Sequence, residues 1–145
     1  KAQVTFFYPN QTLRPVFTRG RFQGQKKWEW VGVKRLPATN QVPSCIWSHP
    51  LRDGRTLSIR FPSVPIQKRM IFELGIQKGG RISKDLSFEI SIGRWGLGLS
   101  PHRRVGHWKQ YLLRPPMTGR HPVNINIKSP TIGKAWLCWR AWFEK

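Results

Sequence analysis

The strongest constraint on the fold is a strict alternation of apolar and polar side chains. In residues 57–61 the three apolar side chains share one parity, and Ser58 and Arg60 share the other. The same period of two recurs in residues 86–92 and in residues 123–128. Because successive side chains on a strand point to opposite faces, each segment predicts a strand with one buried and one wet face.

The rest of the chain carries further strand signals and no helical periodicity. Twelve Pro and thirteen Gly supply turn signals between the apolar segments, and the missing helices argue against parallel βαβ units. The sequence therefore predicts an all-β protein: an antiparallel, jelly-roll-like β-sandwich of eight or nine strands. The strands are expected in residues 2–8, 27–35, 45–49, 55–62, 70–76, 86–93, 107–113, 123–128 and 135–143.

A chain of 145 residues fits one folding domain, and its eight Trp and eight Phe are enough to dominate a core. We expect residues 1–26 to form an N-terminal strand followed by a basic arm or linker, and residues 27–145 to form the sandwich domain. No run of eighteen apolar residues predicts a transmembrane helix, and no signal-peptide pattern is present. Because the chain opens on Lys1, we expect a signal or anchor to precede it.

The charge is extreme, with 26 Lys and Arg against 6 Asp and Glu and a net charge of +20. Self-repulsion at this level destabilises a compact state unless anions neutralise it. The sequence therefore predicts a negatively charged partner: nucleic acid, an anionic glycan, acidic lipid or the acidic face of another protein.

Cys45 and Cys138 lie 93 residues apart, and no spacing of the zinc-binding kind surrounds them. They are either two free buried thiols or one disulfide between an early strand and the last one. In an exported protein the disulfide is favoured, and closing so long a loop contributes roughly 4–5 kcal/mol in the chain-entropy model. We expect the disulfide and an extracytoplasmic location, either periplasmic or on the cell surface.

No catalytic, metal or cofactor site is expected. The six carboxylates are dispersed, and the one conceivable pair, Glu73 and Glu89, is better explained as surface acids that balance nearby Arg. The four His do not cluster in the sequence, and both Cys sit in aromatic strands.

The best candidate for binding is the Gly- and Arg-rich stretch 94–106, which is expected to be a loop. Its glycines lack the following helix and the Lys-Ser/Thr pair of a phosphate loop. An aromatic ring beside several guanidinium groups can stack on a sugar or base and pair with anionic oxygens; the alternative is that Trp95 belongs to the core. The predicted contacts to an anionic partner, two of them in the N-terminal arm, are Arg94, Trp95, His102, Arg103, Arg104, Arg19 and Arg21.

The order of features in residues 42–143 resembles a known family. It runs through Trp-Ser-His-Pro at 47–50, Leu-Gly-Ile at 74–76, Gly-His-Trp at 106–108 and Val-Asn-Ile-Asn-Ile at 123–127. This pattern resembles the jelly-roll domains of bacterial exported proteins related to carbohydrate-binding modules. The resemblance implies a non-catalytic domain for glycan binding or assembly. Where such domains often carry an acid for calcium or sugar, this chain has Gln77 and Lys78, which argues against both uses.

The function predicted first is a non-catalytic binding or assembly module. It would be an accessory subunit of an extracytoplasmic or membrane-associated complex, and its basic surface would contact an acidic partner protein or an anionic glycan. The alternative is a nucleic-acid-associated structural protein, such as a viral jelly-roll coat or a ribonucleoprotein component, whose charge neutralises phosphates.

Overall fold

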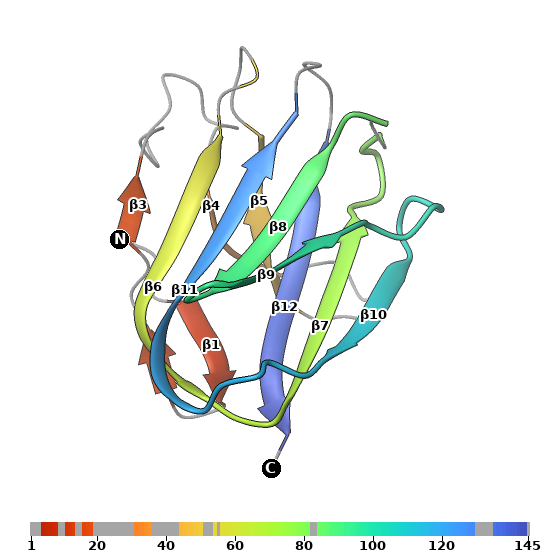
Figure 1. Cartoon of the computed structure of the whole chain (residues 1–145). Coiled ribbons are helices and arrows are strands. Elements are labelled where there is room, and N and C mark those ends of the chain that lie inside the picture. The colour runs from red at the N-terminus through yellow and green to blue at the C-terminus, as the bar shows by residue number, and fades with distance from the viewer. Residues whose placement is uncertain are drawn as a thin grey trace.

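Two β-sheets packed face to face make up the computed structural model (Figure 1). Side chains are described for residues 45–50, 54, 56–81, 84–129 and 135–143. For the strands within residues 4–18 and 31–35, and at residues 44 and 144, the structure describes only the backbone pairing.

The structure describes twelve strands. The seven-stranded sheet runs β10-β7-β12-β1-β2, with β5 and β4 attached to β12, and the five-stranded sheet runs β3-β6-β11-β8-β9. The seven-stranded sheet consists of β1 (Val4–Tyr8), β2 (Gln11–Leu13), β4 (Val31–Arg35), β5 (Ser44–Ser48), β7 (Arg69–Ile76), β10 (Trp108–Leu113) and β12 (Leu137–Glu144). The five-stranded sheet consists of β3 (Val16–Thr18), β6 (Leu57–Ile66), β8 (Ser87–Ile92), β9 (Trp95–Leu99) and β11 (Gly119–Lys128).

Consecutive strands from β6 onward mostly cross from one sheet to the other, as in a jelly roll. The predicted all-β sandwich is confirmed, and the pairing is antiparallel except between β1 and β12, which run parallel. In the part of the chain that the structure describes, no helix is long and apolar enough to span a membrane.

The structure also has strands in two stretches where the sequence predicted none. Residues 94–106 were expected to be a loop, but Trp95–Leu99 forms β9, which pairs in continuous register with β8. Gly96 and Gly98 indicated a loop, but both lie within this hairpin strand. Strands β2 and β3 fall in the stretch expected to be a basic arm. The predicted domain boundary at residue 26 stays a prediction.

The core lies between the sheets and is centred on Trp139 of β12. Its ring stacks on Phe72 at 5.6 Å and meets Phe61 and Phe88 edge-on at 6.4 and 6.2 Å. The indole Nε1–H donates to Ser48 Oγ at 3.0 Å, so the polar group of this fully buried ring is satisfied. Aromatic pairs of this geometry are worth about 0.5–1.5 kcal/mol each beyond the burial of their surface.

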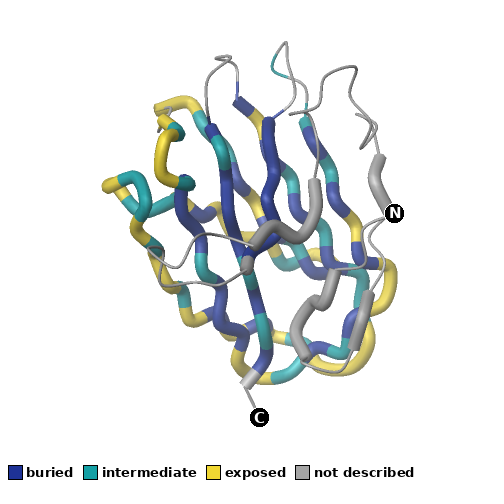
Figure 2. Tube along the Cα trace, turned by 180° about the vertical axis from the view of Figure 1, so that it is seen from behind, coloured by how far each residue is buried: buried dark blue, intermediate teal, exposed yellow. Residues whose placement is uncertain are grey.

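The alternation in the sequence becomes two faces of each sheet. Ile59, Ile90 and Ile125 point inward and are buried, whereas the outer face of the five-stranded sheet is polar, with a hydrogen bond from Ser58 Oγ to Asn126 Oδ1 at 2.8 Å. Figure 2 shows buried residues running along the central strands of the other sheet and exposed residues at the turns. Strand β7 is buried on both faces, because Ile71 on its outer side is also covered.

Gly75 is a position where the fold requires the absence of a side chain. A Cβ on Gly75 would lie 2.5 Å from the backbone oxygen of His107, where β10 begins beside β7. A contact below 3.0 Å forces one of the two backbones to move.

We therefore expect Gly75→Ala to lower the free energy of unfolding by roughly 1–3 kcal/mol, since overpacking displaces β10 from β7. Urea denaturation followed by Trp fluorescence measures the change. The matched control is Gly98→Ala in β9, where an added Cβ meets open space. Equal stability of the two variants would contradict this account of Gly75.

Candidate binding site

Two connections, β7–β8 and β9–β10, lie side by side at one end of the sandwich. The Gly106 N–H donates to the carbonyl of Ile76 at 2.8 Å, which fastens the second connection to the end of β7. A Cβ on Gly106 would lie 3.8 Å from the Cβ of Lys78. Cationic residues about 25 positions apart in the sequence are thereby brought onto one surface.

A third segment, the residues directly before β12, packs against the β7–β8 connection. The Gln77 N–H donates to the carbonyl of Trp136 at 2.8 Å, and Gln77 Oε1 accepts the indole proton of Trp47 at 3.1 Å. The turn at Gly79 has φ +92°, a conformation that other residues rarely adopt, and a Cβ there would lie 3.1 Å from the Trp136 ring. Trp136 stays partly exposed beside this turn.

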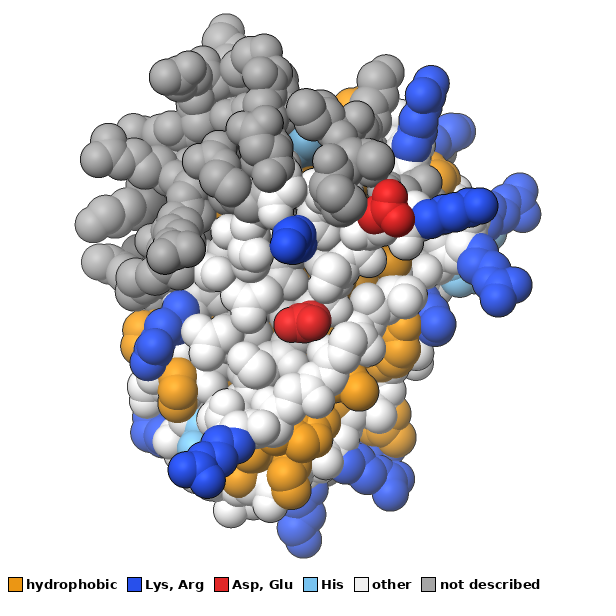
Figure 3. Space-filling model, turned by 45° about the horizontal axis from the view of Figure 1, so that its top comes forward, with side chains coloured by type: hydrophobic (Ala, Val, Ile, Leu, Met, Phe, Trp, Pro, Cys, Tyr) orange, Lys and Arg blue, Asp and Glu red, His pale blue; other side chains and the backbone are white. Residues whose placement is uncertain are grey.

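We name four of the five exposed cations of the two connections the basic loop cluster: Lys78, Arg81, Arg103 and Arg104; the fifth, Lys84, precedes the exposed Asp85 near the start of β8. Figure 3 shows Lys and Arg side chains gathered along this flank of the molecule. Within the described ranges, thirteen Lys and Arg are exposed, whereas three carboxylates have described side chains, so internal neutralisation is sparse. The remaining exposed cations are Arg60, Lys68, Arg69, Lys84, Arg94, Lys109, Arg114, Arg120 and Lys128.

The β9–β10 connection has an ordered interior. The rings of His102 and His107 stack with centroids 5.3 Å apart, and the Arg104 backbone N–H donates to His102 Nδ1 at 3.0 Å. The connection is joined to β10 because Tyr111 Oη accepts from the Ser100 N–H and donates to its carbonyl, both at 2.9 Å. Arg103 and Arg104 therefore lie in a connection whose backbone is held by hydrogen bonds.

The predicted contact residues do not lie together in the structure. His102, Arg103 and Arg104 lie in the β9–β10 connection, whereas Arg94 and Trp95 lie at the β8–β9 turn, at the opposite end of β9. Trp95 is half-buried and packs against the core, and its contact with a partner stays a prediction. Arg19 and Arg21 lie outside the described residues.

Sequence reasoning missed Lys78 and Arg81, which share the flank with Arg103 and Arg104. Their signal in the sequence is the turn sequence Gln-Lys-Gly-Gly-Arg at 77–81, which directly follows a strand. The sequence does not show that β7 pairs with β10, and it is this pairing that brings the turn next to the β9–β10 connection.

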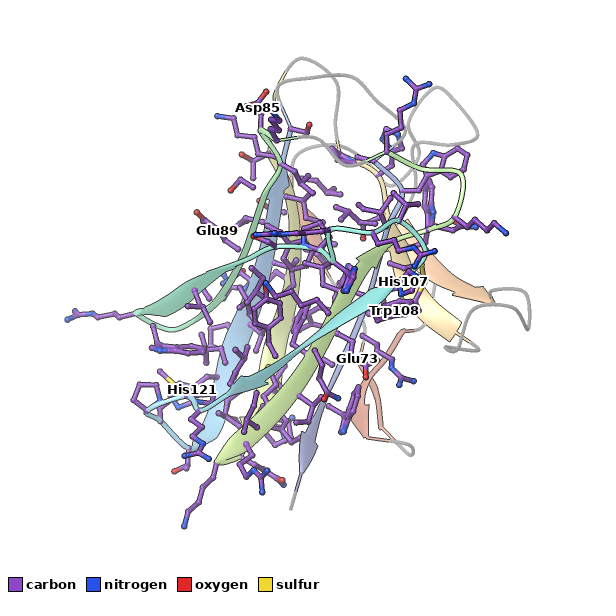
Figure 4. All side chains as sticks on the ribbon, turned by 90° about the vertical axis from the view of Figure 1, so that its right-hand side faces the viewer. Glu73, Asp85, Glu89, His107, Trp108 and His121 are labelled. Atoms are coloured by element: carbon purple, nitrogen blue, oxygen red, sulfur yellow. A yellow bond between two sulfur atoms is a disulfide. The ribbon has the colours of Figure 1, made fainter. Side chains whose placement is uncertain are left out.

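Glu73 and Glu89, the conceivable pair of carboxylates, lie apart. Glu73 and Glu89 belong to different sheets and point away from the core on opposite outer faces, as Figure 4 shows. Glu73 accepts hydrogen bonds from Arg140 Nε at 2.6 Å and from Gln110 Nε2 at 3.3 Å. Both partners lie directly opposite Glu73 on the neighbouring strands, so these bonds link β12, β7 and β10. Among the described residues no three His, Cys, Asp or Glu side chains gather in a way that would hold a metal ion.

The predicted disulfide between Cys45 and Cys138 is confirmed. It joins β5 to β12 on the outer face of the seven-stranded sheet, packed with Trp47 and beside the partly buried rings of Trp108 and Trp136. Figure 4 labels Trp108 and His107 at this edge. The disulfide thus anchors the aromatic layer on which the basic loop cluster rests.

Known proteins offer a likeness of fold. The chain is similar to a solved carbohydrate-binding module, TmCBM61 in complex with β-1,4-galactotriose, with 16% identity, a TM-score of 0.51, and coverage of 96% of this chain and 91% of that one. No family model and no curated protein matches the sequence. At this identity the likeness concerns the fold alone, and it confirms the predicted resemblance in fold to carbohydrate-binding modules.

Replacing both Cys45 and Cys138 by Ser is expected to lower the free energy of unfolding by about 2–5 kcal/mol, because the long loop between them gains freedom in the unfolded chain. Denaturation of the oxidised protein and the double variant measures the loss. The native protein should also show no reactive thiol in denaturant, and two titratable thiols in the oxidised preparation would contradict the assignment.

Proposed function

We propose that this chain is a non-catalytic binding module that holds an anionic glycan at the basic loop cluster. It works as an accessory subunit of an extracytoplasmic or membrane-associated complex. The observation that carries the proposal is that two adjoining connections present these four cations at one end of the sandwich, with the partly exposed ring of Trp136 against the turn at Gly79, on a fold similar to that of a solved carbohydrate-binding module.

The chemistry of the cluster suits a sulfated or uronate sugar. Guanidinium groups pair with planar or tetrahedral oxyanions through two parallel N–H donors, and an indole face can stack on a sugar ring. In the part of the chain that the structure describes, the carboxylates are Glu73, Asp85 and Glu89, and only Asp85 and Glu89 are exposed. A neutral sugar would leave the repulsion among the four cations unrelieved.

The disulfide supports the compartment, because disulfides persist in oxidising environments such as the periplasm and the cell surface. The dispersed carboxylates support a binding role over hydrolysis, since Glu73 is engaged by Arg140 and lies on the face opposite Glu89.

Isothermal titration calorimetry with a sulfated tetrasaccharide tests the ligand class. We expect the sulfated sugar to bind, its desulfated counterpart and galactotriose to bind far more weakly, and the affinity to fall as salt is raised. The double variant Lys78→Gln/Arg81→Gln should weaken binding roughly three- to tenfold, the effect of two exposed charge pairs. The matched control is Arg60→Gln/Lys128→Gln, on the outer face of the five-stranded sheet.

A single-stranded oligonucleotide of equal charge tests the alternative function. If it binds more tightly than the sulfated sugar, with a steep salt dependence shared by both double variants, the whole basic surface acts on phosphates and the nucleic-acid role replaces the glycan role. Equal affinity for the sulfated and the desulfated sugar would also overturn the proposal.

A further inference from the structure

Strand β9 is an edge strand without the usual protection. It pairs with β8 on one side, and no described strand pairs on its other side. Natural edge strands are blunted by charged residues, Pro or bulges. Within β9, Trp-Gly-Leu-Gly-Leu contains no charge and no Pro, and its register with β8 has no shift. An edge strand of the other sheet, β10, by contrast exposes Lys109 and Gln110.

Within the described part of the chain, no contact or backbone conformation explains why β9 contains two glycines. Neither Gly96 nor Gly98 has a left-handed φ, and a Cβ on Gly98 would meet nothing within 4 Å. A Cβ on Gly96 would make ordinary contacts at 3.7 and 3.8 Å. Glycine weakens a strand interior, and where it is kept it often marks a place where a ligand or another backbone approaches closely. Both residues are exposed on the outer face of the sheet.

Leu97 adds an apolar contact at the same edge. It lies opposite the buried Ile90, on the core side of the sheet, yet it is 40% exposed. A strand added beside β9 would place an alternate side chain against Leu97 and close this side of the core. The neighbouring side chains Trp95 and Leu99 are already partly or fully buried.

The charges near the two ends of β9 indicate which kind of strand could pair with its open edge. Arg94 directly precedes the strand, and Arg103 and Arg104 follow it in the β9–β10 connection. Two copies of this chain paired edge to edge in antiparallel fashion would set the Arg94 end of one against the Arg103 end of the other. Like charges placed together oppose such pairing. A partner strand with acidic ends meets cations at both ends.

We propose that β9 is a docking edge for an extended segment of another protein. The segment adds as a sixth strand, packs an aliphatic side chain on Leu97, places larger side chains over Gly96 and Gly98, and carries acidic residues just outside this apolar centre. This is strand addition to an exposed sheet edge. The inference goes beyond glycan binding and rests on the assembly role proposed above.

The probe is a synthetic peptide of about nine residues, in which Val and Tyr alternate between Glu-Asp ends, matched to a strand that spans roughly 17 Å. Calorimetry with the intact, disulfide-bonded chain measures affinity, and amide hydrogen exchange locates the contact. We expect the peptide to bind at least tenfold more tightly than a version with Lys ends. We also expect the β9 amides to become protected while those of β6 do not change.

The decisive variant is Gly98→Thr. The site has room for the side chain, so stability is expected to be unchanged or higher, while peptide binding falls at least tenfold because Thr occupies the space of the partner's side chain. Ser87→Thr, on the same face of β8, should bind as the unaltered chain does. Arg94→Gln should weaken binding roughly threefold.

Three results would overturn the docking edge: full binding by Gly98→Thr, protection confined to residues 77–81 and 101–107, or a concentration-dependent dimer in which β9 is already protected. The sulfated tetrasaccharide separates the two proposals. Gly98→Thr should keep sugar binding, and Lys78→Gln/Arg81→Gln should keep peptide binding, so that each site can fail while the other stands.

Discussion

The contact between the two sheets through Trp139 is the interaction on which the structure depends. The ring stacks on Phe72 of its own sheet and meets Phe61 and Phe88 of the facing sheet, so that one side chain sets the distance between the layers. Its neighbour Cys138 points the other way and is bonded to Cys45. Two successive residues of β12 thus hold the core on one face and the outer aromatic layer on the other.

That outer layer explains how a chain with so few acids builds a defined cationic surface. The loops that carry the cations are tied by backbone hydrogen bonds, from the Gly106 N–H to the Ile76 carbonyl and from the Gln77 N–H to the Trp136 carbonyl. These bonds between uncharged groups position the loops without using the charge of the cationic side chains. The fold therefore brings like charges together, and their repulsion is what the proposed anionic ligand would relieve.

The period-two pattern was enough to predict the sandwich and the inward sides of β6, β8 and β11, because burial of one face of a strand imposes an alternation of apolar and polar residues. The disulfide was predicted separately, from the two cysteines and the expected export of the chain. The pattern failed in residues 94–106, where Gly96 and Gly98 hide the alternation of Trp95, Leu97 and Leu99. It also did not place Lys78 and Arg81 beside Arg103, since that proximity comes from the pairing of β7 with β10 and from the crossing of the chain between sheets. For the same reason, the predicted contact residues are divided: Arg94 and Trp95 lie at one end of β9, and His102, Arg103 and Arg104 lie beyond the other.

The position of the disulfide has a mechanical consequence. Cys45 and Cys138 lie on adjacent strands, β5 and β12, and the core strands β6 to β11 all lie within the loop that the bond closes. A pulling force applied to the chain on either side of the two cysteines is transmitted through the sulfur bridge and never reaches those strands. Pulling could still remove the part of β12 that follows Cys138, which includes the core residue Trp139, but the strands between the two cysteines would bear no load until the bridge was reduced.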